Sequence, residues 1–104
     1  VATNTTLDRG IVSELNRAKV EAWGDGGLSG RGLKAKARAV RRRIRERLPK
    51  EMALLACGGL GSAEDARAAL EEGAALVQVY SALIFQGPGL PGAMNRGLAG
   101  ALRD

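Results

Sequence analysis

The sequence has 104 residues, 45% of them apolar and 3% aromatic, and a net charge of +5, which suits one domain with a core of small side chains. One cysteine excludes an internal disulfide, and the absence of histidine excludes a histidine-based catalytic triad or a histidine-ligated metal within these residues. No apolar run approaches the ~18 residues of a membrane-spanning helix.

The first residues, Val1-Ala2 followed by Thr3-Asn4-Thr5-Thr6, have the composition of a strand that ends in a polar loop. Because a domain seldom begins in this way, we expect the chain to be part of a longer protein. Residues 7–30 begin with helical spacing of apolar residues, and glycines at 24, 26, 27 and 30 then interrupt regular structure. We predict a long loop with one helical turn there.

Apolar residues at 33, 37, 40, 44 and 48 predict a helix with one buried face that ends before Pro49. Between Arg31 and Lys50 there are ten basic residues and one acidic residue, Glu46. The arginines at 41–47 mostly fall off the apolar stripe, so we expect a solvated outer face. A basic face also raises nucleic acid or an anionic membrane as partners, but the helix has no aromatic residue for base stacking.

The second half of the chain alternates short strands with helices. An apolar run at 52–57 predicts a buried strand, followed by a glycine loop at 58–61 and a helix that begins at Ser62 and ends near Gly73, with Asp65 completing a capping box. The mostly apolar run at 75–80 predicts a second buried strand. After a turn at 87–89 we expect a last helix, with Pro91 in its first turn and an apolar stripe through Leu90, Ala93 or Met94, Gly97 or Leu98, and Ala101 or Leu102. This order predicts a parallel α/β sheet.

Four segments rich in glycine or hydroxyl groups are candidates for ligand binding. The glycines at 58–61 precede a capped helix, where backbone N–H groups can hold phosphate, although a tight turn without a ligand explains them equally well. Tyr80-Ser81 follows the next strand, as phosphate sites do in TIM barrels, or else packs and caps a helix. Thr3-Asn4-Thr5-Thr6 suits a planar polar ligand or a hydrophilic turn. Residues 26–30 form either a ligand-approaching loop or a hinge.

Taken in order, four motifs resemble the quinone-dependent dihydroorotate dehydrogenases: Ala-Thr-Asn-Thr-Thr-Leu at 2–7, Gly-Gly-Leu-Ser-Gly at 26–30, Cys-Gly-Gly-Leu at 57–60, and Leu-Val-Gln-Val-Tyr-Ser-Ala-Leu-Ile-Phe-Gln-Gly-Pro at 76–88. The resemblance covers essentially the whole chain. It implies an α/β fold in which residues 1–104 are the C-terminal part of a single FMN-binding TIM (β/α)8 barrel domain. About the last three βα units would be present, and the N-terminal part would be absent.

The resemblance also implies roles for individual residues. Asn4 and Thr5 would bind the substrate dihydroorotate or the product orotate. The residues that would bind FMN are Thr3, Ser29, Gly30, Gly58, Gly59, Tyr80 and Ser81. No catalytic residue is expected in this segment, because the family's general base is a serine on an upstream loop, and no metal ligand is expected either. The flavin would take the hydride, and a quinone would reoxidise it.

By the same resemblance, the complete enzyme would serve pyrimidine biosynthesis as a peripheral protein on the cytoplasmic face of the bacterial cell membrane. Its quinone site would lie in the missing N-terminal region, and nucleic acid would not be a partner. The 104 residues alone are expected to be inactive. Two alternatives stay open: another FMN- or phosphate-binding barrel enzyme, or a basic nucleic-acid-binding module.

Overall fold

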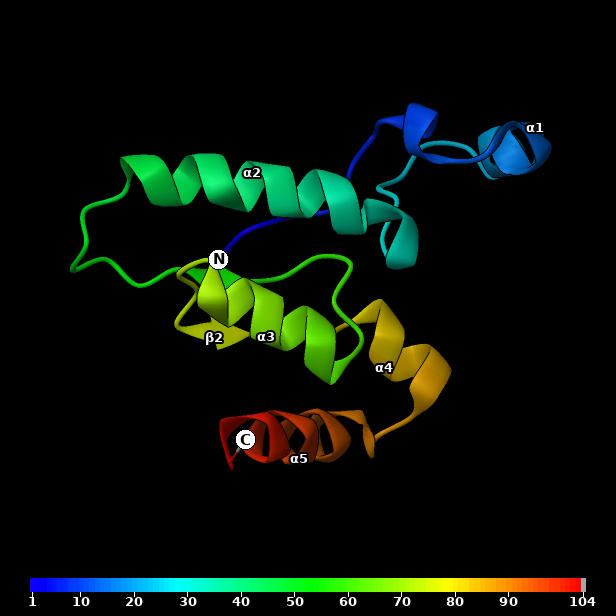
Figure 1. The fold of residues 1–104 in the computed structure, drawn as a ribbon. Coiled ribbons are helices and arrows are strands. Elements are labelled where there is room, and N and C mark those ends of the chain that lie inside the picture. Colours follow the sequence, from blue (N-terminus) through cyan, green and yellow to red (C-terminus); the bar gives the residue numbers. More distant parts are fainter. Residues whose placement is uncertain (104) are drawn as a thin grey trace.

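The computed structural model describes residues 1–103, which form helices around a small central sheet (Figure 1). In chain order, the elements are the 3₁₀-helix η1 (Arg9–Ile11), α1 (Glu14–Ala22), the 3₁₀-helix η2 (Arg31–Leu33), α2 (Lys34–Arg47), β1 (Leu55–Ala56), α3 (Ala63–Glu71), β2 (Leu76–Val77), α4 (Ser81–Gln86) and α5 (Leu90–Arg103). The predicted alternation of helices and strands in the second half of the chain is confirmed. Within the described residues, no helix is both long and apolar enough to span a membrane.

The sheet is parallel, as predicted, but its ladder is short. β1 pairs with β2 so that Leu55 lies opposite Leu76, and Ala2 forms an isolated parallel bridge with Ala56. The strands predicted at 52–57 and 75–80 are therefore paired only at 55–56 and 76–77. The extended backbone continues beyond the ladder, because single hydrogen bonds of 2.8 Å still join the two segments before and after the paired residues.

Small side chains form the core between the sheet and the helices. One buried cluster joins β1 to α3 and consists of Ala56, Leu60, Ala69 and Ala74. A second joins α3 to α5 and consists of Ala66, Leu90 and Met94. Alanines on α3 let this helix approach both layers closely, which large side chains would prevent. The apolar stripe predicted for the last helix is confirmed from Leu90 to Leu98, while the side chain of Leu102 lies outside the described residues.

The buried face predicted for the basic helix is confirmed in its first half, while Ile44 and Leu48 are only half-buried. Leu33 and Ala37 are buried, but Val40 is 38% exposed and Arg41 is only 5% exposed. Positions 40 and 41 both fit a helical repeat that passes through 37 and 44, and hydropathy alone favoured the valine. The expectation that Arg41 lies on the solvated face is therefore wrong. Its long side chain is buried against the end of β1.

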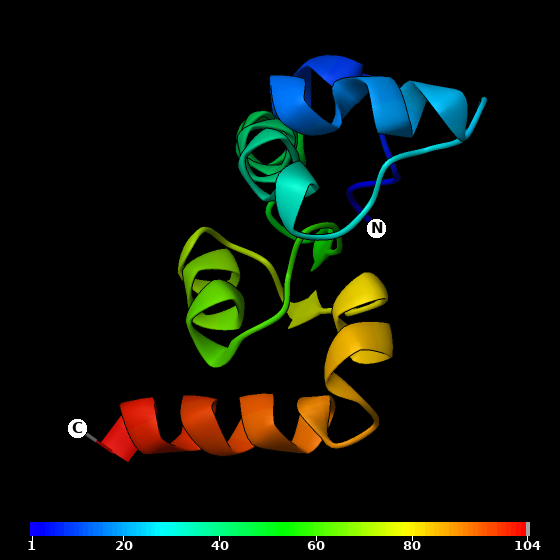
Figure 2. The ribbon, with the colours of Figure 1, turned by 90° about the vertical axis from the view of Figure 1, so that its right-hand side faces the viewer.

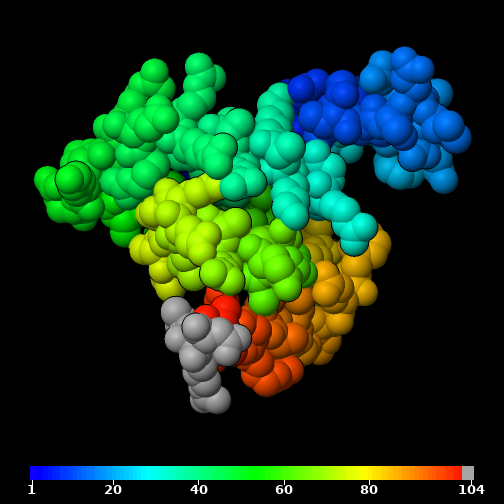
Figure 3. Space-filling model, in the orientation of Figure 1, coloured from blue at the N-terminus to red at the C-terminus, as the bar shows by residue number. Residues whose placement is uncertain are grey.

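The segment 7–30 contains more helix than predicted. Instead of a single turn, it forms η1 and the nine-residue α1, because the interrupting glycines begin only after α1 has ended. Figures 1 and 3 show α1 projecting away from the rest of the molecule. The base of this projection is closed by an antiparallel bridge between Thr6 and Leu28, with N–H to O distances of 3.0 and 2.7 Å.

Two charged side chains hold the projecting segment together. Arg9 donates to the carbonyl oxygens of Gly24 and Gly26 at 3.2 and 2.8 Å. Asp8 accepts a hydrogen bond of 2.8 Å from Lys36 on α2. The first contact links the two ends of the segment, and the second attaches it to the body of the protein.

Three residues after β2 the chain enters α4, a helix that the sequence offered only as the alternative in which Ser81 caps a helix. Tyr80 precedes α4 and Ser81 is its first residue. Figure 2 shows α4 beside the strands, with α5 crossing below it. Ile84 and Phe85 on α4 are 73% and 87% exposed, so this helix presents apolar surface to its surroundings.

Candidate functional site

All nine residues that the sequence singled out line one cavity of about 990 Å³. They are Thr3, Asn4, Thr5, Ser29, Gly30, Gly58, Gly59, Tyr80 and Ser81. Segments that are far apart in the chain thus converge on one concave surface. Their individual roles toward a ligand stay predictions.

Parallel strands explain this convergence. Thr3 follows the bridge residue Ala2, Gly58 follows β1 by one residue, and Tyr80 follows β2 after two residues. Because the carboxyl ends of parallel strands meet at one edge of a sheet, the loops after them surround a common space. The segment 29–30 joins them from the base of the α1 projection.

The first part of the cavity wall is polar and closely packed. The Oδ1 of Asn4 accepts a hydrogen bond of 2.7 Å from the backbone N–H of Thr5. No hydrogen bond among the described residues uses Nδ2 of Asn4, so this amide keeps two donors for a ligand. Gly27 lies directly against Thr5, since a Cβ at Gly27 would be 1.7 Å from the Thr5 hydroxyl oxygen.

Two hydroxyl groups meet across the cavity. The Oγ atoms of Ser29 and Ser81 are 2.6 Å apart, although the residues are separated by half the chain. Each hydroxyl can donate one hydrogen bond and accept others, so the pair can rearrange around a polar chain such as a sugar alcohol. Tyr80, beside Ser81, is 76% exposed and so does not serve as a core residue in the described structure.

The glycine loop after β1 has the features of an anion cradle. Gly58 and Gly59 have φ angles of +109° and +72°, which a side chain would strain. A Cβ at Gly59 would lie 2.4 Å from the Cα of Lys34, so the loop touches the backbone of α2. Within the described part of the chain, no hydrogen bond uses the backbone N–H of Gly58, Gly59, Tyr80 or Ser81. Free N–H groups on a cavity wall are suited to phosphate oxygens.

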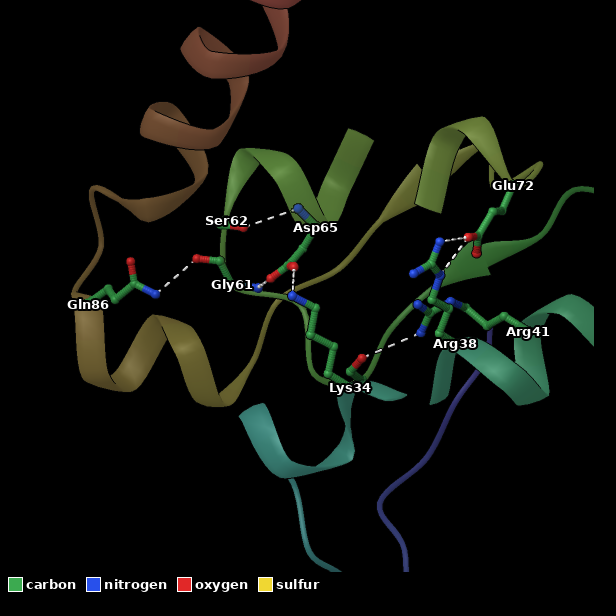
Figure 4. Close-up of polar contacts among 9 residues, drawn as sticks. Lys34, Arg38, Arg41, Gly61, Ser62, Asp65, Glu72 and Gln86 are labelled. Atoms are coloured by element: carbon green, nitrogen blue, oxygen red, sulfur yellow. Dashed lines mark hydrogen bonds and ion pairs between the residues drawn. The ribbon is translucent and has the colours of Figure 1, made fainter. Parts of the chain in front are cut away.

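An ion pair braces the far side of this loop (Figure 4). Lys34 pairs with Asp65, whose carboxylate also accepts a hydrogen bond of 3.0 Å from the N–H of Gly61. Gln86 on α4 donates to the carbonyl oxygen of Gly61 at 3.0 Å. Burial raises the pKa of Asp65, but the hydrogen bonds from Lys34 and Gly61 outweigh it, so the pKa lies below its ordinary value.

Replacing Asp65 with asparagine is expected to lower the free energy of unfolding by about 1–2 kcal/mol at neutral pH, because the carboxylate is 10% exposed and accepts charge-assisted hydrogen bonds. Because the pKa of Asp65 is lower in the folded than in the unfolded protein, its carboxylate stabilises the fold above pH 3.8, the ordinary pKa of the group. This stabilisation is lost as the pH falls through the lower pKa of the folded state. Urea unfolding of both proteins at a series of pH values measures the difference, which should shrink in acid.

The matched control is Glu64→Gln, which removes the exposed neighbouring carboxylate from the same helical turn. It should change stability by no more than about 0.5 kcal/mol. Equal destabilisation by the two substitutions, or a D65N effect that persists in strong acid, would show that the Asp65 contacts do not stabilise the loop.

Most arginines of α2 have partners within the protein. Arg38 and Arg42 both bond to Glu72 at the end of α3, at 2.6 and 3.0 Å, and Arg38 in particular holds the pKa of Glu72 below its ordinary value. Arg45 donates to the backbone oxygens of the turn after the helix, and Arg41 is buried. This distribution supports a helix face that braces the neighbouring elements more than a surface that awaits a polyanion.

Several residues on the cavity wall were not predicted. They include Arg31, Lys34, Cys57, Asp65, Gln78, Phe85 and Gln86. The sequence predicts only a helix-capping role for Asp65. In the structure Ser62 Oγ caps the helix by accepting a hydrogen bond of 3.1 Å from the Asp65 N–H. No spacing rule connects Lys34 to Asp65, because the contact depends on how α2 and α3 pack.

Comparisons with known proteins agree with this geometry. Residues 1–102 match the family model described as dihydroorotate dehydrogenase. Relatives named dihydroorotate dehydrogenase (quinone) come from Sinorhizobium fredii, 46% identical over 95% of this chain, and from Brucella melitensis, 44% identical over 99%. A crystal structure of DHODH from Eimeria tenella in complex with ferulenol superposes on 98% of the chain with a TM-score of 0.84 and 31% identity. The chain spans only 26% or 27% of the length of these proteins.

Proposed function

Because the chain belongs to the dihydroorotate dehydrogenase family, we propose that it is the C-terminal part of a quinone-linked enzyme that oxidises dihydroorotate to orotate in pyrimidine biosynthesis. The observation that carries the proposal is the convergence of all nine predicted ligand residues on one cavity. The names of the two bacterial relatives support a quinone as the acceptor. The activity is proposed for the full-length protein, since the chain spans about a quarter of its relatives.

The cavity wall fits FMN. A phosphate oxygen suits the free backbone N–H groups of the glycine loop and of the turn into α4. At Gly59 a side chain would crowd the backbone of α2, so the loop keeps its backbone open there. Ser29 and Ser81 offer hydroxyl groups to a ribityl chain, and Gly30 leaves room beside them. Thr3, at the strand end, would lie against the ring of bound FMN. Bound FMN would supply the hydride acceptor, and the protein would supply position and electrostatics.

Asn4 and Thr5 fit the substrate end of the same cavity. The free amide donors of Asn4 suit the carbonyl and carboxylate oxygens of an orotate-like ring, and the Thr5 hydroxyl can donate or accept. Neither group can accept a proton at neutral pH, so both residues would orient the ring without removing its proton. The base is proposed to come from the part of the enzyme outside these residues.

The fold suggests how the remaining protein would complete this site. We propose that the pairing of Ala2, β1 and β2 continues into a closed (β/α)8 barrel, in which further strands cover both edges of the present sheet. The quinone site and peripheral attachment to the cytoplasmic face of the membrane would also belong to the additional part.

Anaerobic mixing of the full-length protein with dihydroorotate tests this function directly. The visible absorbance of the bound flavin should bleach, and a soluble quinone should restore it while orotate accumulates. Orotate added in place of dihydroorotate is the control, because it has no hydride to give. A flavin that binds but does not bleach would favour another FMN- or phosphate-binding barrel enzyme. A protein without flavin that binds nucleic acid in a steeply salt-dependent manner would favour the basic module instead.

A further inference from the structure

We infer that Arg41 is a positioning residue for the phosphate end of FMN: it holds two peptide groups of the glycine loop so that their N–H groups face the cavity. The inference rests on the proposed function, but no ligand contact of Arg41 itself is involved. Arg41 is absent from the residues that line the cavity.

Burial of Arg41 is the first observation. It is 5% exposed and is the one charged residue that is buried in the part of the chain that the structure describes. Burial lowers its pKa, although nearby acidic groups oppose this effect. A charged group in such surroundings destabilises the fold unless its hydrogen-bonding groups find partners.

The partners of Arg41 are the second observation. Its Nη1 donates to the carbonyl oxygens of Cys57 and Gly58, both at 3.4 Å. A trans peptide group points its C=O and the following N–H in opposite directions, and both of these peptide groups are trans. The Cys57 oxygen also accepts from the N–H and the hydroxyl of Thr3, at 2.5 and 3.4 Å, whereas the Gly58 oxygen has Arg41 as its one partner among the described residues. Because Arg41 contacts both oxygens, the N–H groups of Gly58 and Gly59 point away from it, and both glycines line the cavity.

Charge balance is the third observation. No ion pair among the described residues includes Arg41. The carboxylates whose charge acts on Arg41, Glu72 and Asp65, are already paired with Arg38 and Lys34, respectively (Figure 4). Glu72 also pairs with Arg42. An anion bound by the N–H groups of the loop would lie one peptide group away from this cation and would stabilise it. The same attraction would strengthen the binding of the anion.

The experiment measures the affinity of full-length apoprotein for FMN and for riboflavin, which lacks the phosphate, by flavin fluorescence. Arg41→Met removes the charge and the donors but keeps an unbranched chain. We expect FMN to bind about 10- to 100-fold more weakly, and riboflavin to change by less than about threefold. Arg41→Lys should lie between Met and wild type, because a cation remains but the shorter lysine side chain and its compact ammonium do not reproduce the planar guanidinium. Arg43→Met, an exposed arginine of the same helix, is the control and should change neither affinity.

The outcomes separate the inference from the proposed function. If wild-type protein binds neither flavin, the proposed function fails. If wild type binds FMN and R41M has wild-type affinity for both flavins, Arg41 has no role toward the phosphate. The same conclusion follows if R41M and R41K each lose affinity for FMN and for riboflavin to the same degree. A selective loss of FMN affinity in R41M or R41K supports the positioning role.

Discussion

Substitution of Gly59 by alanine is expected to abolish FMN binding by the full-length protein and to destabilise it by about 3 kcal/mol or more. Two effects combine. The residue has φ +72°, where alanine costs about 1 kcal/mol, and its Cβ would meet the Cα and N of Lys34 at 2.4 and 2.5 Å. Both atoms belong to the backbone, so no side-chain rotation relieves the contact. Either the glycine loop or the start of α2 must move, and both line the cavity.

Gly87→Ala is the matched control for this prediction. Gly87 also has a positive φ, +88°, but a Cβ there would meet nothing within 4 Å. It therefore reports the backbone strain without the collision. Thermal unfolding and flavin content after purification measure both variants. Comparable losses in the two proteins would mean that backbone strain alone accounts for the effect and that the close approach of Lys34 is unimportant.

Asn4→Ala is expected to lower kcat/KM for dihydroorotate by about 100-fold while flavin content stays as in wild type. The variant removes the two free donors of the amide, and each hydrogen bond to a charged ligand group contributes about 1.5–3 kcal/mol. It also removes the acceptor that holds the Thr5 N–H at 2.7 Å, so the neighbouring substrate residue loses its orientation as well. Steady-state kinetics with a soluble quinone, together with the absorbance ratio of flavin to protein, measure both quantities.

Asn16→Ala serves as the control, since Asn16 is an exposed asparagine on α1 that bonds only to Ser13 among the described side chains. It should leave kcat/KM within about twofold of wild type. An unchanged kcat/KM in N4A would remove Asn4 from the substrate site. Loss of flavin in N4A would assign it to the cofactor instead.

The sequence predicted the parts of the fold that depend on local patterns. Spacing of apolar residues located α2 and α5, and the Ser62 cap located the start of α3, because these signals lie within a few turns of one helix. Strand lengths were overestimated, since pairing depends on the partner segment as well as on hydropathy. α4 was predicted only as one of two alternatives, because its six residues carry apolar side chains on an exposed face, which no periodicity distinguishes from a strand that continues.

The candidate site was predictable to the extent that it is made of motifs. Resemblance supplied residues 3–5, 29–30, 58–59 and 80–81, and all of them line the cavity. Arg41 and Lys34 could not be predicted in the same way, because their positions depend on the packing of α2 against the loop after β1. Position 41 shows the difficulty plainly: an arginine next to valine in a basic run has the composition of a solvated surface, yet the geometry of the helix buries it.

The bridge between Thr6 and Leu28 has a consequence for how this protein can vary. It closes the chain on itself immediately after Asn4 and Thr5 and immediately before Ser29, so the α1 projection leaves and rejoins the body at one place. Arg9 reinforces the same closure from inside by holding the carbonyl oxygens of Gly24 and Gly26. The length of the segment beyond this bridge is thereby uncoupled from the positions of the residues that line the cavity. A change in the length of that appendage beyond the Arg9 contacts would therefore leave the positions of the cavity residues unchanged.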